Sequence, residues 1–255
     1  MLKTSCRCRW CGEVYPAGAE VDVDNGGFFC EMCDGFTYFS DEDNDRHRML
    51  LLLESGGAAK EAPRTGAAAP LTLRKRVSPL RYPGGKSHVI GQLFERMQDE
   101  NLDTFVEVFA GGASLGLSLL DAGIIKKLVL NDIDPLVYSF WKTVLDDPAP
   151  ILEKLRGPSP TLEDFWAAKR FAAGYTAFEA ARCADAAWAF FFLNRTCYSG
   201  IIKAHPLGGK HGGGEKFLSR WNPPALEKRI LRVHSLRGNI ELHAIDCCEL
   251  LESIA

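Results

Sequence analysis

A short apolar run, a glycine-rich turn and an amphipathic stretch follow one another near the middle of the chain. Residues 104–109 are mostly apolar and lead into Ala110-Gly111-Gly112-Ala113. Leucines at positions 115, 117, 119 and 120 then support a helix that ends near Gly123. The pattern predicts a strand, a tight turn and a helix in direct succession.

Two further apolar runs lead toward acidic residues. Residues 127–130 run into Asn131-Asp132, and residues 240–244 are followed closely by Asp246. Both runs have the length of a strand, and strands that alternate with helices are typical of parallel α/β sheets. Open sheets of this kind bind ligands at the carboxyl ends of their strands, so we expect a ligand site near these acids.

A long segment between these runs is helical by composition and rich in aromatic residues. It covers residues 162–193, and most of its aromatic side chains are expected in the core. The pattern breaks at residues 194–200 and gives way to a stretch rich in Gly and Lys at 205–216. That stretch is too polar for a core and is predicted to be a loop.

Two Cys-x-x-Cys pairs lie close to the amino terminus. They are Cys8-Arg9-Trp10-Cys11 and Cys30-Glu31-Met32-Cys33, separated by 18 residues. Because this spacing is typical of a structural zinc site with four thiolates, we predict a small zinc ribbon. Cys6 is an alternative ligand to Cys8, and a set of free thiols is the alternative to a metal site.

The segment between the two pairs resembles a β-hairpin. Short strands are expected at Val14-Tyr15, Val21-Asp22-Val23 and Phe28-Phe29, with a turn at Asn25-Gly26. Because such a small module buries little apolar surface, the metal would supply much of its folding free energy. We assign residues 1–40 to this module and residues 41–77 to a short helix and a flexible linker, which is rich in Gly, Ala and Pro at 55–72.

Composition changes this picture little, but the distribution of charge adds to it. The 255 residues are 46% hydrophobic and 25% charged, which suits one sizeable core and a small accessory module. The apolar run at 188–193 is far shorter than a membrane span, and no secretory signal begins the chain, so we expect a cytoplasmic protein.

Residues 195–237 contain nine Lys or Arg against two Glu, a local net charge of +7 that favours a nucleic-acid partner.

The glycine-rich turn distinguishes between classes of nucleotide. Gly111, Ala113 and Gly116 have the dinucleotide-binding spacing, except that alanine stands at the position where glycine lets a pyrophosphate approach. Asp132 follows Gly112 by 20 residues, where a carboxylate accepts hydrogen bonds from ribose hydroxyls. S-adenosylmethionine has the ribose and no phosphate. Taken alone, the motif fits equally well a structural βαβ unit whose glycines serve packing.

Four motifs in order make the resemblance specific. They are Tyr82-Pro83-Gly84-Gly85-Lys86, Glu107-Val108-Phe109-Ala110-Gly111-Gly112, Asn131-Asp132-Ile133 and Leu193-Asn194-Arg195-Thr196. In this order and at these separations, they resemble the Dam-type (class alpha) DNA adenine-N6 methyltransferases over residues 78–255. The resemblance implies a Rossmann-like α/β fold dependent on S-adenosylmethionine, with its cofactor half at 78–150 and 239–255 and a helical DNA-recognition insert at 151–238.

The resemblance also implies roles for particular residues. Cofactor contacts are expected at Tyr82, Lys86, Glu107, Phe109, Gly111, Gly112, Asp132 and Asp246. DNA contacts are expected at Arg195, which would touch the backbone, and at Tyr198, which would wedge beside the target base. The charge pattern adds Lys203, Lys210, Lys216 and Arg220 as phosphate contacts on double-stranded DNA.

One expected motif is missing from the 255 residues. Neither Asp-Pro-Pro-Tyr nor Asn-Pro-Pro-Tyr occurs, and the nearest strings are Asp147-Pro148-Ala149-Pro150 and Asn222-Pro223-Pro224-Ala225. We therefore expect a methyltransferase domain truncated before its catalytic motif, with no catalytic residue of its own. The alternatives are a nucleic-acid-binding zinc-ribbon protein with a degenerate methyltransferase domain, and an RNA adenine methyltransferase.

Overall fold

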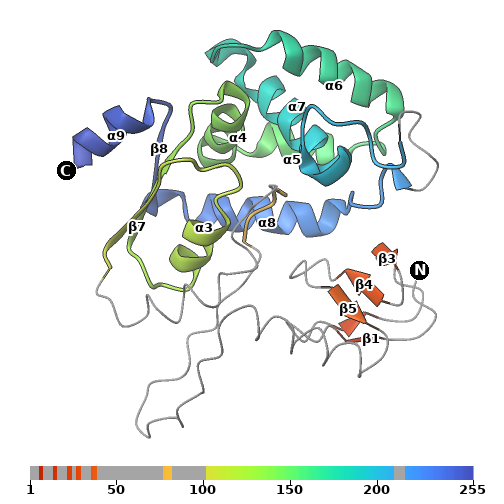
Figure 1. Cartoon of the computed structure of the whole chain (residues 1–255), viewed down its shortest axis with the longest axis horizontal. Coiled ribbons are helices and arrows are strands. Elements are labelled where there is room, and N and C mark those ends of the chain that lie inside the picture. Colours follow the sequence, from red (N-terminus) through yellow and green to blue (C-terminus); the bar gives the residue numbers. More distant parts are fainter. Residues whose placement is uncertain are drawn as a thin grey trace, which may run out of the picture. The chain divides into compact units, whose positions relative to one another are not determined.

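The chain divides into two compact units, Met1–Thr72 and Leu73–Ala255. Figure 1 shows the computed structural model of the chain. It describes residues 77–81, 102–209 and 216–254, together with five short strands in the first 40 residues. The four cysteines of the predicted zinc site, the predicted helix and linker at 41–76, and Tyr82, Lys86 and Lys210 lie outside the described residues.

The first unit contains two small antiparallel sheets. Strand β1 (Cys6–Arg7) pairs with β2 (Val14–Tyr15), and β3 (Asp22–Asp24), β4 (Gly27–Phe29) and β5 (Phe36–Tyr38) form a three-stranded sheet. Asp24 lies opposite Gly27, so Asn25-Gly26 is the two-residue connection of a hairpin. This dipeptide favours the turns whose twist matches paired strands, and the predicted hairpin is confirmed.

The second unit is built on a parallel sheet in the order β6-β7-β8. The strands are β6 (Thr104–Glu107), β7 (Lys127–Asn131) and β8 (Ile240–His243). Helix α3 (Ser114–Asp121) connects β6 to β7. The predicted strands are confirmed with differences of one or two residues at their carboxyl ends. Leu128, Val129 and Leu130 of the central strand are buried, as expected for a strand covered on both faces.

The rest of the second unit is helical. Its combination of a parallel sheet with helices fits the α/β fold expected for a methyltransferase. The remaining helices are α4 (Pro135–Asp146), α5 (Ala149–Arg156), α6 (Leu162–Gly174), α7 (Cys183–Thr196), α8 (Pro223–Ser235) and α9 (Cys247–Ile254), with short turns η2 (Ala180–Arg182), η3 (Tyr198–Gly200) and η5 (Arg237–Asn239). Helices α4, α5 and α6 all contact α7, and Figure 1 shows the four grouped together.

Aromatic side chains fill the space between α4 and α7. Phe140 stacks on Phe191 with ring centroids 5.7 Å apart, and it also contacts Trp141 and Phe190. All four side chains are buried. The apolar run at 188–193 is therefore buried, and Phe190 and Phe191 share a core with the sheet residues Leu128 and Leu130. In the described part of the chain, no helix has the length and apolar character that crossing a membrane requires.

The two strings that come nearest to the missing tetrapeptide both begin helices. Asn222 accepts a hydrogen bond from the amide of Ala225 (3.2 Å), and Pro223 opens α8. Asp147 accepts one from the amide of Ala149 (3.0 Å) just before α5. Prolines in a first helical turn lose no hydrogen bond; Asn222 is the N-cap of α8, whereas Asp147 ends α4 and Pro148 is the N-cap of α5. Helix initiation accounts for both strings.

Candidate functional site

One buried asparagine ties together the carboxyl ends of all three parallel strands. Asn131 is 2% exposed. Its Nδ2 donates to the carbonyl oxygens of Val108 (3.1 Å) and Ile245 (3.0 Å), and its Oδ1 accepts from the amide of Ile245 (3.0 Å). The residues that follow β6 and β8 are thus fixed to the end of β7. The sequence pattern does not indicate this role for Asn131.

Asp132 holds the turn that follows β6. Its Oδ2 accepts from the amide of Gly111 (2.9 Å) and its Oδ1 from the amide of Asp134 (3.1 Å). Burial raises the pKa of Asp132, the two backbone hydrogen bonds partly offset this rise, and the charge of Asp134 adds to it. A carboxylate offers about four acceptor positions, so acceptor capacity remains for the hydroxyls of a ligand.

The glycine-rich turn has a backbone conformation that favours small residues. Gly111 (φ 45°) and Ala113 (φ 46°) both lie in the left-handed region. The indole Nε1 of Trp141 donates to the Gly111 carbonyl (2.9 Å), which fixes the turn from the side of α4. Ala113 is buried at the start of α3. The turn is therefore held from two directions, by Trp141 and by Asp132.

Glu107 and Gly116 bring α3 close to the sheet. Glu107 Oε1 accepts from the amide of Gly116 (2.6 Å) in the first turns of α3. A Cβ at position 116 would lie 2.4 Å from Leu128 Cδ1, closer than real contacts allow. Packing thus explains Gly116, in agreement with the structural reading of the motif, and Glu107 has a structural partner in addition to its predicted cofactor role.

Two large apolar side chains are exposed at this edge of the sheet. Phe109 follows β6 and is 74% exposed, and Ile133 follows β7 and is 66% exposed. Each lies near the polar residues just described, so the edge combines hydrogen-bond acceptors with apolar surface, as small-molecule sites do. Phe109 was predicted as a site residue. Ile133 was missed, although an apolar residue directly after Asn131-Asp132 was the available signal.

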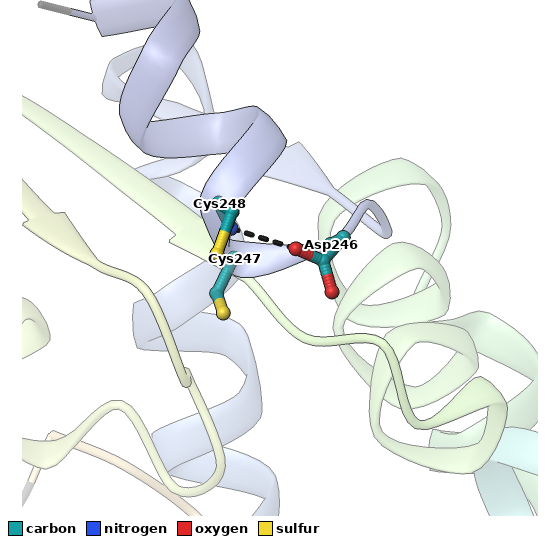
Figure 2. Close-up of side chains that lie close together, drawn as sticks. All are labelled: Asp246, Cys247 and Cys248. Atoms are coloured by element: carbon teal, nitrogen blue, oxygen red, sulfur yellow. Dashed lines mark hydrogen bonds between the residues drawn. The ribbon is translucent and has the colours of Figure 1, made fainter.

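Asp246 lies beyond the end of β8, beside two cysteines (Figure 2). Its Oδ1 accepts from the amide of Cys248 (2.8 Å) at the start of α9. One ligand atom from each of Asp246, Cys247 and Cys248 lies within 4.8 Å of the others. A hydrogen bond with Cys247 is the main cause that raises the pKa of the Cys248 thiol, and the charges of Cys247 and Asp246 add to it. Helix capping accounts for the position of Asp246.

The structure places Arg195 inside the insert. The side chain is 6% exposed, and its Nε and Nη2 donate to the carbonyl oxygen of Arg220 at 3.2 and 2.8 Å. In this structure Arg195 supports the backbone at Arg220, and its predicted contact with the DNA backbone remains a prediction. Spacing along the sequence could not reveal this burial.

Tyr198 is presented on a rigid turn. It is 65% exposed, and its amide donates to the carbonyl of His205 (2.9 Å). Ser199 and Gly200 both have positive φ, at 54° and 73°. Lys169 of α6 donates from its Nζ to the carbonyl oxygens of Ile202 (2.6 Å) and Ala204 (3.1 Å), a role that the sequence did not suggest. The turn is thus supported from both sides.

The thiol of Cys197 also lies under this turn. Its Sγ donates to the carbonyl oxygens of Ile202 and Ala204, both at 3.6 Å. Burial raises the pKa of Cys197 to about 11, although the charge of Lys169 lowers it somewhat. The group is therefore a neutral donor at physiological pH, as expected for a structural cysteine.

The predicted phosphate contacts differ in exposure. Lys203 and Lys216 are exposed and Arg220 is half-buried. In α8, Lys228 is exposed, Arg229 is buried and Arg232 pairs with Asp121 of α3. Lysine side chains therefore supply exposed positive charge near the Tyr198 turn and on α8. Their contacts with DNA remain predictions.

The chain matches one family model and is similar to two known methylases. A family model described as D12 class N6 adenine-specific DNA methyltransferase matches residues 82–251. The chain is 25% identical over 184 residues to the type II methyltransferase M.MjaIII of Methanocaldococcus jannaschii, over 64% of this chain and 62% of that protein. It is 32% identical over 71 residues to the modification methylase StsI of Streptococcus sanguinis, over 28% of this chain and 10% of that protein. The chain thus spans less than two thirds of the length of each.

Replacing Asn131 should destabilise the sheet edge. Asn131→Ala removes the partners of the Val108 and Ile245 backbone groups, so we expect a loss of about 2–3 kcal/mol in the free energy of unfolding, measured by urea denaturation. The matched control is Asn239→Ala, because that exposed side chain donates to one backbone carbonyl, that of Lys126 (2.8 Å). Equal losses in the two variants would contradict the role given to Asn131.

Proposed function

The chain belongs to the D12 class N6 adenine-specific DNA methyltransferases, and on this premise we propose that residues 78–255 bind S-adenosylmethionine at the carboxyl edge of β6, β7 and β8 and present the helical insert to adenine in duplex DNA. The observation that carries the proposal is the meeting of Asp132, Phe109 and Ile133 at one sheet edge. A nucleoside needs both an acceptor for its ribose hydroxyls and apolar contact for its base.

The residues of this edge fit S-adenosylmethionine. Asp132 has acceptor capacity left after its two backbone bonds, and Asp246 offers a second, exposed carboxylate. Phe109 and Ile133 offer apolar surface for the adenine ring and exclude water from it. Ala113 occupies the position where a pyrophosphate-binding turn has glycine. When bound, the cofactor supplies an activated methyl group on sulfur.

The insert supplies the features that DNA binding requires. Tyr198 offers an exposed ring on a turn held by hydrogen bonds, and such a ring can fill the space left by an extruded base. Lys203 and Lys216 are exposed, which supports their proposed role, shared with Lys210, as phosphate contacts. A rigid wedge loses little conformational entropy on binding, which favours extrusion of the base.

We further propose that these 255 residues bind without methylating. They contain no Asp-Pro-Pro-Tyr or Asn-Pro-Pro-Tyr, and the two nearest strings begin helices. An aromatic ring stacked on the flipped adenine and acceptors for its amino group are what this segment would have to provide.

The amino-terminal unit is proposed to be a zinc ribbon. Its two confirmed hairpin strands, β3 and β4, lie between the two Cys-x-x-Cys pairs in the sequence. Four thiolates close the coordination sphere of zinc, so the ion would be structural and would take no part in methyl transfer.

Asp132 should control affinity for the cofactor and its dependence on pH. We expect Asp132→Asn to weaken S-adenosylmethionine binding about tenfold to hundredfold in calorimetry, because a charged acceptor is lost. In the wild type, affinity should fall as the carboxylate is protonated. Because the pKa of Asp132 is raised, the fall should begin at a higher pH than for an exposed aspartate.

The control for this measurement is Asp103→Asn. Asp103 is exposed at the opposite end of β6, where it pairs with Lys126 (2.5 Å). This variant should bind the cofactor as the wild type does. Unchanged affinity in Asp132→Asn, or tight binding of a nicotinamide dinucleotide in place of S-adenosylmethionine, would show that the site has been misassigned.

Methyl transfer should be absent although both ligands bind. With tritiated S-adenosylmethionine and an adenine-containing duplex, we expect no incorporation above the blank, while anisotropy detects binding of the same duplex. Structured RNA serves as the competitor, because preferential binding of RNA would favour the RNA-directed alternative. Methylation at an ordinary enzymatic rate would disprove the proposed lack of turnover.

Metal analysis should find one zinc ion per chain. Cys8→Ser and Cys30→Ser should each lose most of the zinc and unfold the first unit, because the remaining thiolates close the coordination sphere less well. Cys247→Ser is the matched control, because Cys247 belongs to the separate cluster at the start of α9. Zinc that is retained in the first two variants and lost in the third would move the site to α9.

A further inference from the structure

The start of α9 brings two thiols and a carboxylate together. One ligand atom from each of Asp246, Cys247 and Cys248 lies within 4.8 Å of the others, and Figure 2 shows the three side chains. The Cys248 thiol is hydrogen-bonded to both Cys247 and Asp246. Cys247 is half-buried, whereas Asp246 and Cys248 are exposed. Solvent therefore reaches this group, which we call the α9 triad.

The backbone that carries the triad is fixed on both sides. Just before it, the amide and the carbonyl of Ile245 bind the side chain of Asn131, both at 3.0 Å. Just after it, the amide of Leu250 donates to the carbonyl of Asp246 (3.0 Å), and Leu250 is 2% exposed. The triad thus loses little conformational freedom when it binds a ligand, which favours binding.

The geometry of the triad suits a metal ion. Two thiolates that bind one zinc ion, each about 2.3 Å from it, lie about 3.8 Å apart in tetrahedral geometry. The spacing within the triad, 4.8 Å or less, allows small side-chain rotations to reach this value. One carboxylate oxygen of Asp246 accepts from the amide of Cys248 (2.8 Å). Because a carboxylate has about four acceptor positions, Asp246 can keep this bond and hold an ion at the same time.

We propose that the α9 triad binds a thiophilic divalent ion, of the class of zinc and cadmium, through the Sγ atoms of Cys247 and Cys248 and a carboxylate oxygen of Asp246. Soft thiolates select such ions, whereas magnesium and calcium prefer oxygen ligands. On binding, the ion replaces the two thiol protons, which pass to solvent, and water fills the fourth position. The site goes beyond the proposed function and does not depend on it.

The α9 triad differs in its ligands from the zinc site proposed in the first unit. The ribbon would enclose its ion with four thiolates, whereas the triad offers three ligands and is open to solvent. We therefore expect the purified chain to keep the zinc of the ribbon and to take up an ion at α9 only when metal is added. Asp246 is also a proposed contact of the cofactor, so the test omits S-adenosylmethionine.

The test is a cadmium titration of the full 255-residue chain with its thiols reduced. Charge transfer from thiolate to cadmium absorbs in the ultraviolet and reports sulfur ligands directly. The wild type is compared with the double variant Cys247→Ser/Cys248→Ser, in which hydroxyls of similar size replace the soft ligands. Both chains contain the cysteines of the first unit, so the difference between them belongs to α9. We expect the wild type to bind one cadmium ion more than the double variant.

A pair of carboxylate variants tests the third ligand. Asp246→Asn keeps an acceptor for the Cys248 amide, so the start of α9 stays intact, but it removes the charged oxygen. We expect it to weaken cadmium binding about tenfold or more, because even groups outside the ligand sphere change metal affinity by that much. Glu249→Gln is the matched control, since Glu249 is exposed in the same helical turn and lies outside the triad. It should bind cadmium nearly as the wild type does.

A single thiol elsewhere controls for unspecific uptake. Cys183 of α7 is half-buried and belongs to no group of metal-ligating side chains among the described residues. Cys183→Ser should therefore bind as many cadmium ions as the wild type. If the double variant at α9 does not fold, Cys248→Ser takes its place, because that side chain is exposed.

Equal cadmium uptake by the wild type and the double variant would overturn the inference. So would equal affinities in Asp246→Asn and Glu249→Gln, or displacement of cadmium by a modest excess of magnesium. Each comparison keeps the first unit and the remaining sheet edge unchanged. A first unit without zinc, or a chain that binds no S-adenosylmethionine, would therefore contradict the earlier proposals and leave the result at α9 readable.

Discussion

The need of buried backbone groups for hydrogen-bond partners shapes the edge where the parallel strands end. Beyond its last residue a strand no longer has the sheet ladder to satisfy its amides and carbonyls, and an unpaired buried group is costly. Asn131, the last residue of β7, supplies these partners to the segments that follow β6 and β8 with one amide side chain. The position of Asp132, the turn at Gly111 and the start of α9 all depend on that junction.

The same solution occurs in the helical insert. Asn194 satisfies the backbone of Arg81, Arg195 satisfies the carbonyl of Arg220, and Lys169 satisfies two carbonyls beneath the Tyr198 turn. In each case a polar side chain that would be expected on the surface is turned toward the backbone of a distant segment. Hydrogen bonds of this kind hold irregular segments in place where no strand or helix supplies partners.

The residues that we propose for binding are separate from the two strings that come nearest to the catalytic tetrapeptide. The sheet edge and the insert provide acceptors, apolar surface and positive charge, and none of these groups by itself activates an adenine amine. Both strings that come close to the motif for that chemistry are used to begin helices.

What the sequence alone determined is mainly local. The apolar runs predicted β6, β7 and β8, and the Asn25-Gly26 dipeptide predicted the hairpin of β3 and β4, because strand periodicity and turn conformation depend on neighbouring residues. Four ordered motifs were enough to indicate the family that the comparison then showed.

The tertiary structure decided which polar residues are buried. The burial of Arg195, the exposure of Ile133 and the bonds of Asn131 and Asn194 depend on partners as far as 113 or 114 positions away, such as Arg81 and Ile245. The hydrophobic pattern along the sequence cannot predict such hydrogen bonds. They form only when the folded chain brings two distant backbone segments together and excludes water from both.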